Sequence, residues 1–273
     1  MQNGKIGVGI ITCDRLEFFV KASNSLVNAS KKYPNIEIVI VNDGTSALET
    51  PDINCINTLG RTGVGKAKNL ALKELMSKNC EHIFLMEDDI LIKNGEVFQK
   101  YIDTALNTGV KHLNFGLHGN HNLDLNKKPI VRKTINYTDG CKIDLYPNLL
   151  GAFSYYHIDV LDKCGLIDEE YYNALEHVDH TYQIIKEGYH PPFRWFADIH
   201  NSQNYLEDIV EDHKESKIRS DEDFHKKFIT ALDIFIKKNN FSVIGNYGPQ
   251  EKNYTIQEVI QNLITIHEKH ARK

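Results

Sequence analysis

The sequence predicts an α/β protein built on a mostly parallel sheet with flanking helices. Two observations support this prediction: three apolar segments rich in β-branched residues, and segments between them whose apolar residues recur at helical spacing. Strand–helix–strand order of this kind is typical of parallel strands joined by right-handed crossovers. With 41% hydrophobic and 25% charged residues, the 273-residue chain has the composition of an ordinary globular protein.

The first third of the chain carries the clearest pattern. We expect strands over residues 5–11, 36–41 and 82–86 and helices over 15–33 and 64–79. The middle is less regular and is read as short strands at 112–116, 129–135, 142–146, 151–158 and 193–198, with a helical stretch within 168–188 that ends at Gly188.

Two helices, at about 221–238 and 255–270, are expected to close the chain. The stretch from Asn201 to about Lys227 is crowded with charge, which favours a solvated helix face or a mobile loop. We therefore divide the chain into a main α/β domain over residues 1–203 and a helical C-terminal extension over 204–273.

Acidic residues follow each of the first three predicted strands. Asp14 follows the first, Asp43 the second, and Glu87, Asp88 and Asp89 the third. The carboxyl ends of parallel strands meet at one edge of a sheet, where ligands bind. Adjacent carboxylates repel, so a metal ion, a helix N-terminus or water has to compensate them. Asp14 also suits the N-cap of the helix predicted from residue 15.

The segment "GRTGVGKA" (60–67) nearly matches the phosphate-binding P-loop and makes an NTPase an alternative. Ala67 stands where that motif needs a hydroxyl for magnesium, the segment before it is a poor buried strand, and only one helix separates it from the acidic motif. Gly63 and Gly65 still permit close backbone approach at a helix N-terminus, which suits a diphosphate.

Charge and cysteine content set further limits. The net charge of −5 does not indicate a nucleic-acid partner, although a local basic patch is compatible with it. Five cysteines without a C-x-x-C pair indicate reduced thiols, as in a cytoplasmic protein. Neither a signal peptide nor an apolar run of roughly 20 residues is found, so any membrane association is expected to be peripheral.

Four motifs, in this order, resemble those of GT-A glycosyltransferases, especially the family 2 type. They are "IITCDR", "VNDGT", "GVGKAKNLAL" and "FLMEDDI", which together cover residues 6–91. They match a "TYNR"-like turn, a "DDGS"-like turn, a "GxxxARN"-like helix start and the DXD motif. "EDD" is also similar to the N-acetylglucosaminyltransferase I branch of the fold. Further on, "NALEHVDHTYQIIKEGYH" (173–190) resembles the family segment "EDvDlxxRlxxxG".

The resemblance implies a metal-dependent, inverting transferase that moves a hexosyl or N-acetylhexosaminyl group from a UDP-sugar to an acceptor hydroxyl. Mn²⁺ or Mg²⁺ would be held by Asp89 and His200. Residues expected to contact the nucleotide sugar are Thr12, Asp14, Arg15, Asp43, Arg61, Gly63, Lys68, Asn69, Glu87 and Asp88. The acceptor, whether a glycan, a lipid-linked glycan or another hydroxyl-bearing molecule, is open.

The family's base lies in a Glu-Asp pair, but here the second position is His177. Glu176 is the expected base, with Asp179 orienting the acceptor or the base, and His177 is an alternative because histidine is a common general base near neutral pH. On a helix, Glu176 and Asp179 would share a face, which is also what an ordinary charged helix face looks like. The alternative to an enzyme is an inactive GT-A domain that only binds a nucleotide sugar or a partner.

Overall fold

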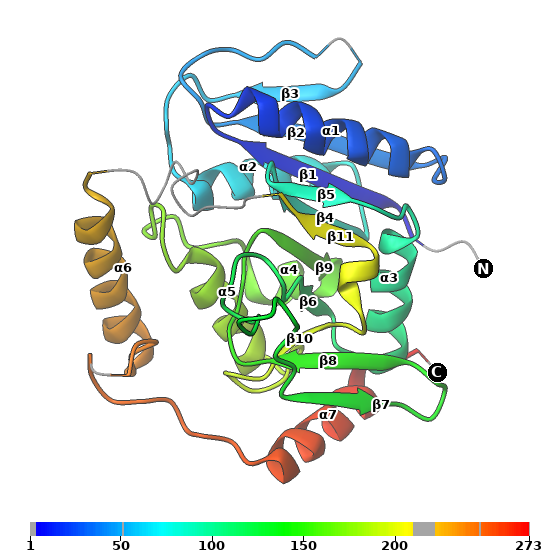
Figure 1. Ribbon diagram of the computed structural model, residues 1–273, viewed down its shortest axis with the longest axis vertical. Coiled ribbons are helices and arrows are strands. Elements are labelled where there is room, and N and C mark those ends of the chain that lie inside the picture. The colour runs from blue at the N-terminus through cyan, green and yellow to red at the C-terminus, as the bar shows by residue number, and fades with distance from the viewer. Residues whose placement is uncertain (1–3, 51, 210–221, 246, 273) are drawn as a thin grey trace.

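The computed structural model describes residues 4–50, 52–209, 222–245 and 247–272. Its centre is a six-stranded sheet in the order β3-β2-β1-β4-β9-β6 (Figure 1). The strands are β1 (Ile6–Thr12), β2 (Ile36–Asn42), β3 (Asn54–Asn57), β4 (His82–Glu87), β6 (His112–Asn114) and β9 (Phe153–His157). β1, β2, β3 and β4 run parallel, whereas β9 is antiparallel to both β4 and β6. The predicted mostly parallel α/β sheet is confirmed.

The register of the parallel strands determines where the acidic residues lie. Thr12 at the end of β1 is paired with Asn42 on β2, and Ile11 is paired with Glu87 on β4. Three strands therefore end at one edge of the sheet, and the acidic residues that follow them meet there.

Helices cover both faces of the sheet. They are α1 (Leu16–Ser30), α2 (Val64–Ser77), α3 (Val97–Thr108), α4 (Ile158–Cys164) and α5 (Glu176–Lys186). Buried residues of α1 and α3 form one apolar core with one face of the sheet, and buried residues of α2, α4 and α5 form another with the opposite face. Burying both faces explains why β1 carries an uninterrupted buried run rather than alternating residues.

Two smaller sheets complete the fold. One is three-stranded, in the order β10-β8-β7, and the other pairs β5 with β11. Their bounds are β5 (Ile90–Ile92), β7 (Lys133–Asn136), β8 (Lys142–Tyr146), β10 (Phe196–Ile199) and β11 (Leu206–Asp208). A short 3₁₀ turn, η1 (Ser202–Asn204), precedes β11. The expected helix within 168–188 is shorter, because Leu175 adopts a left-handed φ of 64° and α5 starts only at Glu176.

The last two helices, α6 (Phe224–Asn239) and α7 (Ile256–His270), pack onto the rest of the molecule. α6 stands beside α5 (Figure 1), and its buried Leu232 and Phe235 join a core that contains Phe193 and Phe196. α7 packs against α3 through the same core that contains α1. Part of the charged stretch, residues 210–221, lies outside the described residues. No helix within the described ranges is long and apolar enough to cross a membrane.

Candidate active site

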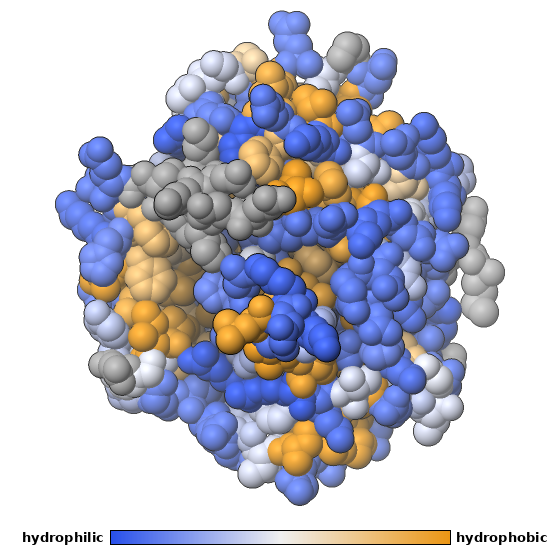
Figure 2. Space-filling view, in the orientation of Figure 1, coloured by the Kyte–Doolittle hydropathy of each residue, from blue (hydrophilic) through white to orange (hydrophobic). Residues whose placement is uncertain are grey.

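A cavity of about 1280 Å³ opens at the carboxyl edge of β1, β2 and β4. Of the residues proposed from sequence, it is lined by Thr12, Arg15, Asp43, Arg61, Glu87, Asp88, Asp89, Glu176 and His177. Among the described lining residues we do not find Asp14, Gly63, Lys68, Asn69, Asp179 or His200. Apolar side chains gather in the hollow beside α6 (Figure 2), where Phe224 and Phe228 line the cavity.

The end of β4 carries a compact group of acidic residues with internal partners. Thr12 Oγ1 donates a hydrogen bond of 2.7 Å to Asp88, and Arg15 pairs with both Asp88 and Asp89, at 3.0 Å in the latter case. Arg15 is the N-cap of α1, and no side chain caps this helix, so the cap role considered for Asp14 is not found. Burial raises the pKa of Asp88 to about 7 because it outweighs the attraction of Arg15.

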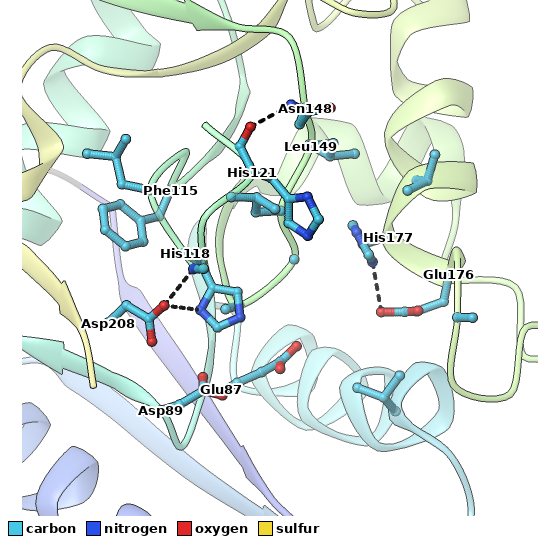
Figure 3. Close-up of a pocket in the computed structure, with 18 of the residues that line it drawn as sticks. Glu87, Asp89, Phe115, His118, His121, Asn148, Leu149, Glu176, His177 and Asp208 are labelled. Atoms are coloured by element: carbon cyan, nitrogen blue, oxygen red, sulfur yellow. Dashed lines mark hydrogen bonds and ion pairs between the residues drawn. The ribbon is translucent and has the colours of Figure 1, made fainter. Parts of the chain in front are cut away.

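Two residues that the sequence analysis missed lie beside Asp89. β11 pairs with β5 and brings Asp208 opposite Ile90, next to the acidic end of β4. His118 reaches in from the loop after β6, and its Nδ1 is 3.1 Å from Asp208 Oδ2 (Figure 3). Burial lowers the pKa of His118, but Asp208, Asp89 and Glu87 outweigh burial and raise it to about 9. Neither residue belongs to a motif, and Asp208 lies in the charged stretch that the sequence predicts to be solvated.

Lys68 holds two glutamates together under the cavity floor. Its Nζ is 2.8 Å from Glu87 Oε1, 3.2 Å from Glu176 Oε1 and 3.1 Å from the carbonyl oxygen of Gly151. The lysine is only 2% exposed. Burial lowers its pKa, but the two carboxylates outweigh burial and raise it above the usual range. Lys68 is therefore a buried counter-charge rather than an exposed helix lysine.

His177 is the half-buried partner of Glu176. Its Nδ1 lies 3.1 Å from Glu176 Oε1, and the ring faces the cavity (Figure 3). Burial raises the pKa of Glu176, but the charges of His177 and Lys68 outweigh burial and hold it well below its usual range. The ring packs on Gly151, where a Cβ atom would come within 2.7 Å of it. An ionised, buried glutamate that holds a histidine at a cavity wall is suited to proton transfer.

The two remaining acidic strand ends hold loops in place. Asp14 accepts hydrogen bonds from the backbone and hydroxyl of Thr45 and pairs with Arg61 at 3.0 Å. Asp43 accepts from the backbone of Thr62 and from the backbone of Gly63, at 2.9 and 3.0 Å. Asp43 thereby fixes the start of α2, while Arg61 lies on the cavity wall.

Three proposed site residues have partners elsewhere. Asn69 bonds the backbone of Ile167 in both directions. Asp179 accepts from Lys238 and Asn239 of α6, at 2.7 and 2.9 Å. His200 Nδ1 lies 3.1 Å from both carboxylate oxygens of Asp144 on β8. These three side chains connect elements of the fold in this structure.

The oxygen donor at Asp89 suits a divalent cation whose coordination is completed by oxygens of the bound substrate and by water. Within the described ranges, no group of three or more histidine, cysteine or acidic side chains is arranged to hold a metal. Asp89 Oδ1, however, is a buried oxygen with no hydrogen-bond partner. Mg²⁺ and similar cations are often held by one or two carboxylates together with substrate phosphates and water. An unpartnered carboxylate oxygen at a cavity wall is the kind of donor that such a site uses.

Comparison with known proteins agrees with this fold. No family model matches the chain. The sequence is 26% identical over 196 residues, 67% of this chain and 71% of the relative, to an uncharacterized glycosyltransferase, R363, of Acanthamoeba polyphaga mimivirus.

Two solved structures of similar fold are S. aureus TarS and GalNAc-T7. TarS residues 1–349 in complex with UDP superpose with a TM-score of 0.53 at 15% identity, over 96% of this chain and 80% of TarS. GalNAc-T7 with UDP, GalNAc and Mn²⁺ gives a TM-score of 0.50 at 11% identity, over 66% of this chain and 40% of that protein. The chain has the GT-A fold of glycosyltransferases, which confirms the resemblance carried by its four motifs.

Proposed function

We propose that this protein transfers a sugar from a nucleotide-sugar donor, a UDP-sugar, to an acceptor hydroxyl with inversion at the anomeric carbon. The observation that carries the proposal is the acidic end of β4, which faces a large cavity and includes one buried, unpartnered carboxylate oxygen. The kinship to a protein named a glycosyltransferase, and the UDP bound to TarS and to GalNAc-T7, support the same function.

The donor occupies the part of the cavity between Thr12 and Arg61. Asp43 and Arg61 face the nucleotide, and Glu87 and Asp88 face the ribose and the donor sugar. Arg15 lies between Asp88 and Asp89 and is the cavity-lining cation closest to them in the described residues. Lys68 acts indirectly, because its ammonium is buried between two glutamates and keeps Glu87 ionised.

Mn²⁺ or Mg²⁺ would be held by Asp89 together with Asp208. His200 is not a ligand in this proposal, because it lies at Asp144. His118 lies at Asp208 on the cavity wall, but its raised pKa favours the protonated ring, so it is not counted as a ligand either. When bound, the cation would stabilise the negative charge that grows on the departing diphosphate.

His177 is the base in this proposal, and Glu176 orients it. The ionised Glu176 accepts the hydrogen of Nδ1, so the lone pair of the neutral ring is on Nε2. Nε2 takes the proton of the acceptor hydroxyl as the oxygen attacks the anomeric carbon and the nucleoside diphosphate leaves from the opposite face. Asp179 contributes by fixing α5 to α6 rather than by contacting the acceptor.

Thermal unfolding with UDP and Mn²⁺ tests the donor site. Together they should stabilise the protein by about 2.7 kcal/mol at a ligand concentration of 100 Kd, because they bind only the folded state. ATP should stabilise it much less. Asp89→Asn should remove the part of the stabilisation that depends on Mn²⁺. The matched control is Asp162→Asn, which makes the same change at an exposed position on α4.

Other outcomes would point to the alternatives. A larger response to ATP than to UDP would favour the NTPase. Full UDP–Mn²⁺ stabilisation in Asp89→Asn would place the cation elsewhere. Donor binding without transfer to any acceptor or to water would favour an inactive GT-A domain.

A further inference from the structure

A second, smaller pocket adjoins the acceptor side of the large cavity. Its volume is about 270 Å³, and Pro147, Phe193 and Arg194 line both spaces. The other lining residues are Arg132, Ser242, Gln250, Glu251, Lys252 and Asn253. The small pocket is therefore rich in hydrogen-bond donors, in contrast to the apolar wall beside α6.

Two arginines in this pocket are held without a counter-ion. The guanidinium of Arg132 stacks over Trp195 at 4.9 Å, and that of Arg194 over Phe193 at 5.5 Å. Arg194 also donates a hydrogen bond of 2.6 Å to the carbonyl oxygen of Val243. Neither arginine has a carboxylate partner in the part of the chain that the structure describes. Burial and the charge of Arg132 both lower the pKa of Arg194, which means that the two cations repel each other.

The backbone conformation of Arg194 adds to the free-energy cost of holding the two arginines close together. Its φ is +70°, a left-handed conformation that an arginine rarely adopts. Non-glycine residues held in such conformations cluster at binding sites, where the surrounding structure fixes them. Stacking on two aromatic rings also leaves guanidinium edges available for an oxyanion.

The other charged groups of the pocket do not neutralise the pair. Glu251 accepts a hydrogen bond of 3.3 Å from Tyr182, while Lys252 pairs with Glu258 at 2.6 Å. Two unpaired arginines therefore outnumber one acidic residue that lines the pocket. An anion with several oxygens is the ligand that this surplus fits, and planar guanidinium groups match phosphate oxygens in a bidentate geometry.

We propose that Arg132 and Arg194 form a phosphate subsite that binds an anionic group of the acceptor. The inference rests on the proposed transferase function. In that proposal the acceptor hydroxyl lies at His177, and this defines the acceptor side of the cavity. Phe193 and Pro147 connect the two spaces, so one molecule can place its hydroxyl in the cavity and its phosphate at the arginines. The acceptor is therefore a phosphate-bearing alcohol.

Inorganic phosphate is the first probe, and it needs no donor. Trp195 is the single tryptophan of the chain and lies under Arg132, so its fluorescence reports on the subsite. At constant ionic strength, phosphate should change this emission saturably. Arg194→Gln should weaken the binding at least tenfold, because it removes the charge-assisted hydrogen bonds of the guanidinium. Arg132→Gln should weaken phosphate binding to a similar extent. For this variant the affinity is measured by calorimetry, because removing Arg132 from the Trp195 ring alters the fluorescence itself.

Lys226→Gln is the matched control. It removes one positive charge from the exposed face of α6 without touching either pocket, and it should bind phosphate like the parent. Equal phosphate affinity in all three variants, or no saturable binding by the parent, would overturn the proposal.

Glycerol 3-phosphate and hexyl phosphate, each compared with the neutral alcohol, extend the test to acceptors. Both esters should compete with phosphate, and glycerol and hexanol should not. Tighter binding of hexyl phosphate would assign the phosphate to a lipid-borne acceptor that also uses the apolar wall, and tighter binding of glycerol 3-phosphate to a polyol acceptor. If the arginine variants lose phosphate while the parent fails to bind UDP with Mn²⁺, the subsite stands and the transferase function falls. If the parent binds the donor but not phosphate, the transferase function stands and the subsite falls.

Discussion

Replacing Lys68 with methionine should destabilise the protein strongly, because it leaves two acidic residues that line the cavity, Glu87 and Glu176, without their shared cation. Breaking a buried ion pair by removing one partner typically costs about 3–5 kcal/mol. The side chain of Glu176 is only 4% exposed, whereas that of Glu87 is 21% exposed and can be reached by water. Most of the cost should therefore come from Glu176, and we expect a loss near the lower limit, about 3 kcal/mol.

Urea unfolding followed by circular dichroism measures this loss. Lys66→Met is the matched control, because Lys66 lies two residues away on the same helix and is exposed. It should change the free energy of unfolding by less than about 0.5 kcal/mol. The double variant Lys68→Met/Glu176→Gln should recover most of the loss, because the uncompensated carboxylate is then gone. A difference below about 1 kcal/mol between the two lysine variants would refute the reasoning, because it is far less than removing a buried counter-charge costs.

The pH dependence of this stability loss tests the same interpretation. In the parent, His177 and Lys68 hold the pKa of Glu176 below its unfolded value, so the stability from this group is present above that value and is lost as the pH falls. Without Lys68, the pKa of Glu176 should rise in the folded state, because His177 alone then opposes burial. The folded variant then binds more protons than the folded parent, so its stability deficit should grow as the pH rises from about 4 to 7. A deficit that shrinks over this range would also contradict the interpretation.

Two further predictions concern the proposed base. His177→Ala should lower sugar transfer by roughly 10²- to 10⁴-fold while UDP and Mn²⁺ still raise the melting temperature, and transfer at the parent rate would exclude His177 as the base. Gly151→Ala should also lower transfer without weakening donor binding, because the new Cβ would lie 2.7 Å from the His177 ring. The control is Gly245→Ala, where a Cβ meets open space and sugar transfer should be normal. Transfer by all three variants is measured with a radiolabelled donor.

Three of the four parallel strands were predictable because their signals are local, whereas the edge strand β3, in a segment that the sequence analysis reads as a poor buried strand, was not. β1, β2 and β4 start and end within a residue of the predicted bounds, since each is a short apolar run followed by a polar turn. The helix α3 was not among the predicted elements, although "KNGE" (93–96) marks a turn between β5 and the first residue of this helix. In the middle of the chain, the turn at Leu175 has no glycine to mark it.

The site was less predictable, because spacing along the chain gives no side-chain direction. Asp179 was grouped with Glu176 on one helix face, but it contacts α6, whose position depends on tertiary packing. His118 and Asp208 carry no local signal at all, since both reach Asp89 from elsewhere in the chain. The pairing of β5 with β11 brings Asp208, and the loop after β6 brings His118. The motifs identified the edge of the sheet where the cavity lies. Tertiary structure then places His118, and not His200, on the cavity wall beside Asp208.

The pairing of β5 with β11 also orders events during synthesis. Long-range pairings of this kind form late, because the entropy of closing a long loop has to be overcome first. A chain emerging from the ribosome presents the three acidic residues after β4 well before Asp208 has been made. Arg15 and Lys68, their nearest cations, precede them in the sequence and are already present at that stage. The nascent chain can therefore neutralise its acidic edge with its own side chains, and the proposed cation site is completed only when translation has passed β11.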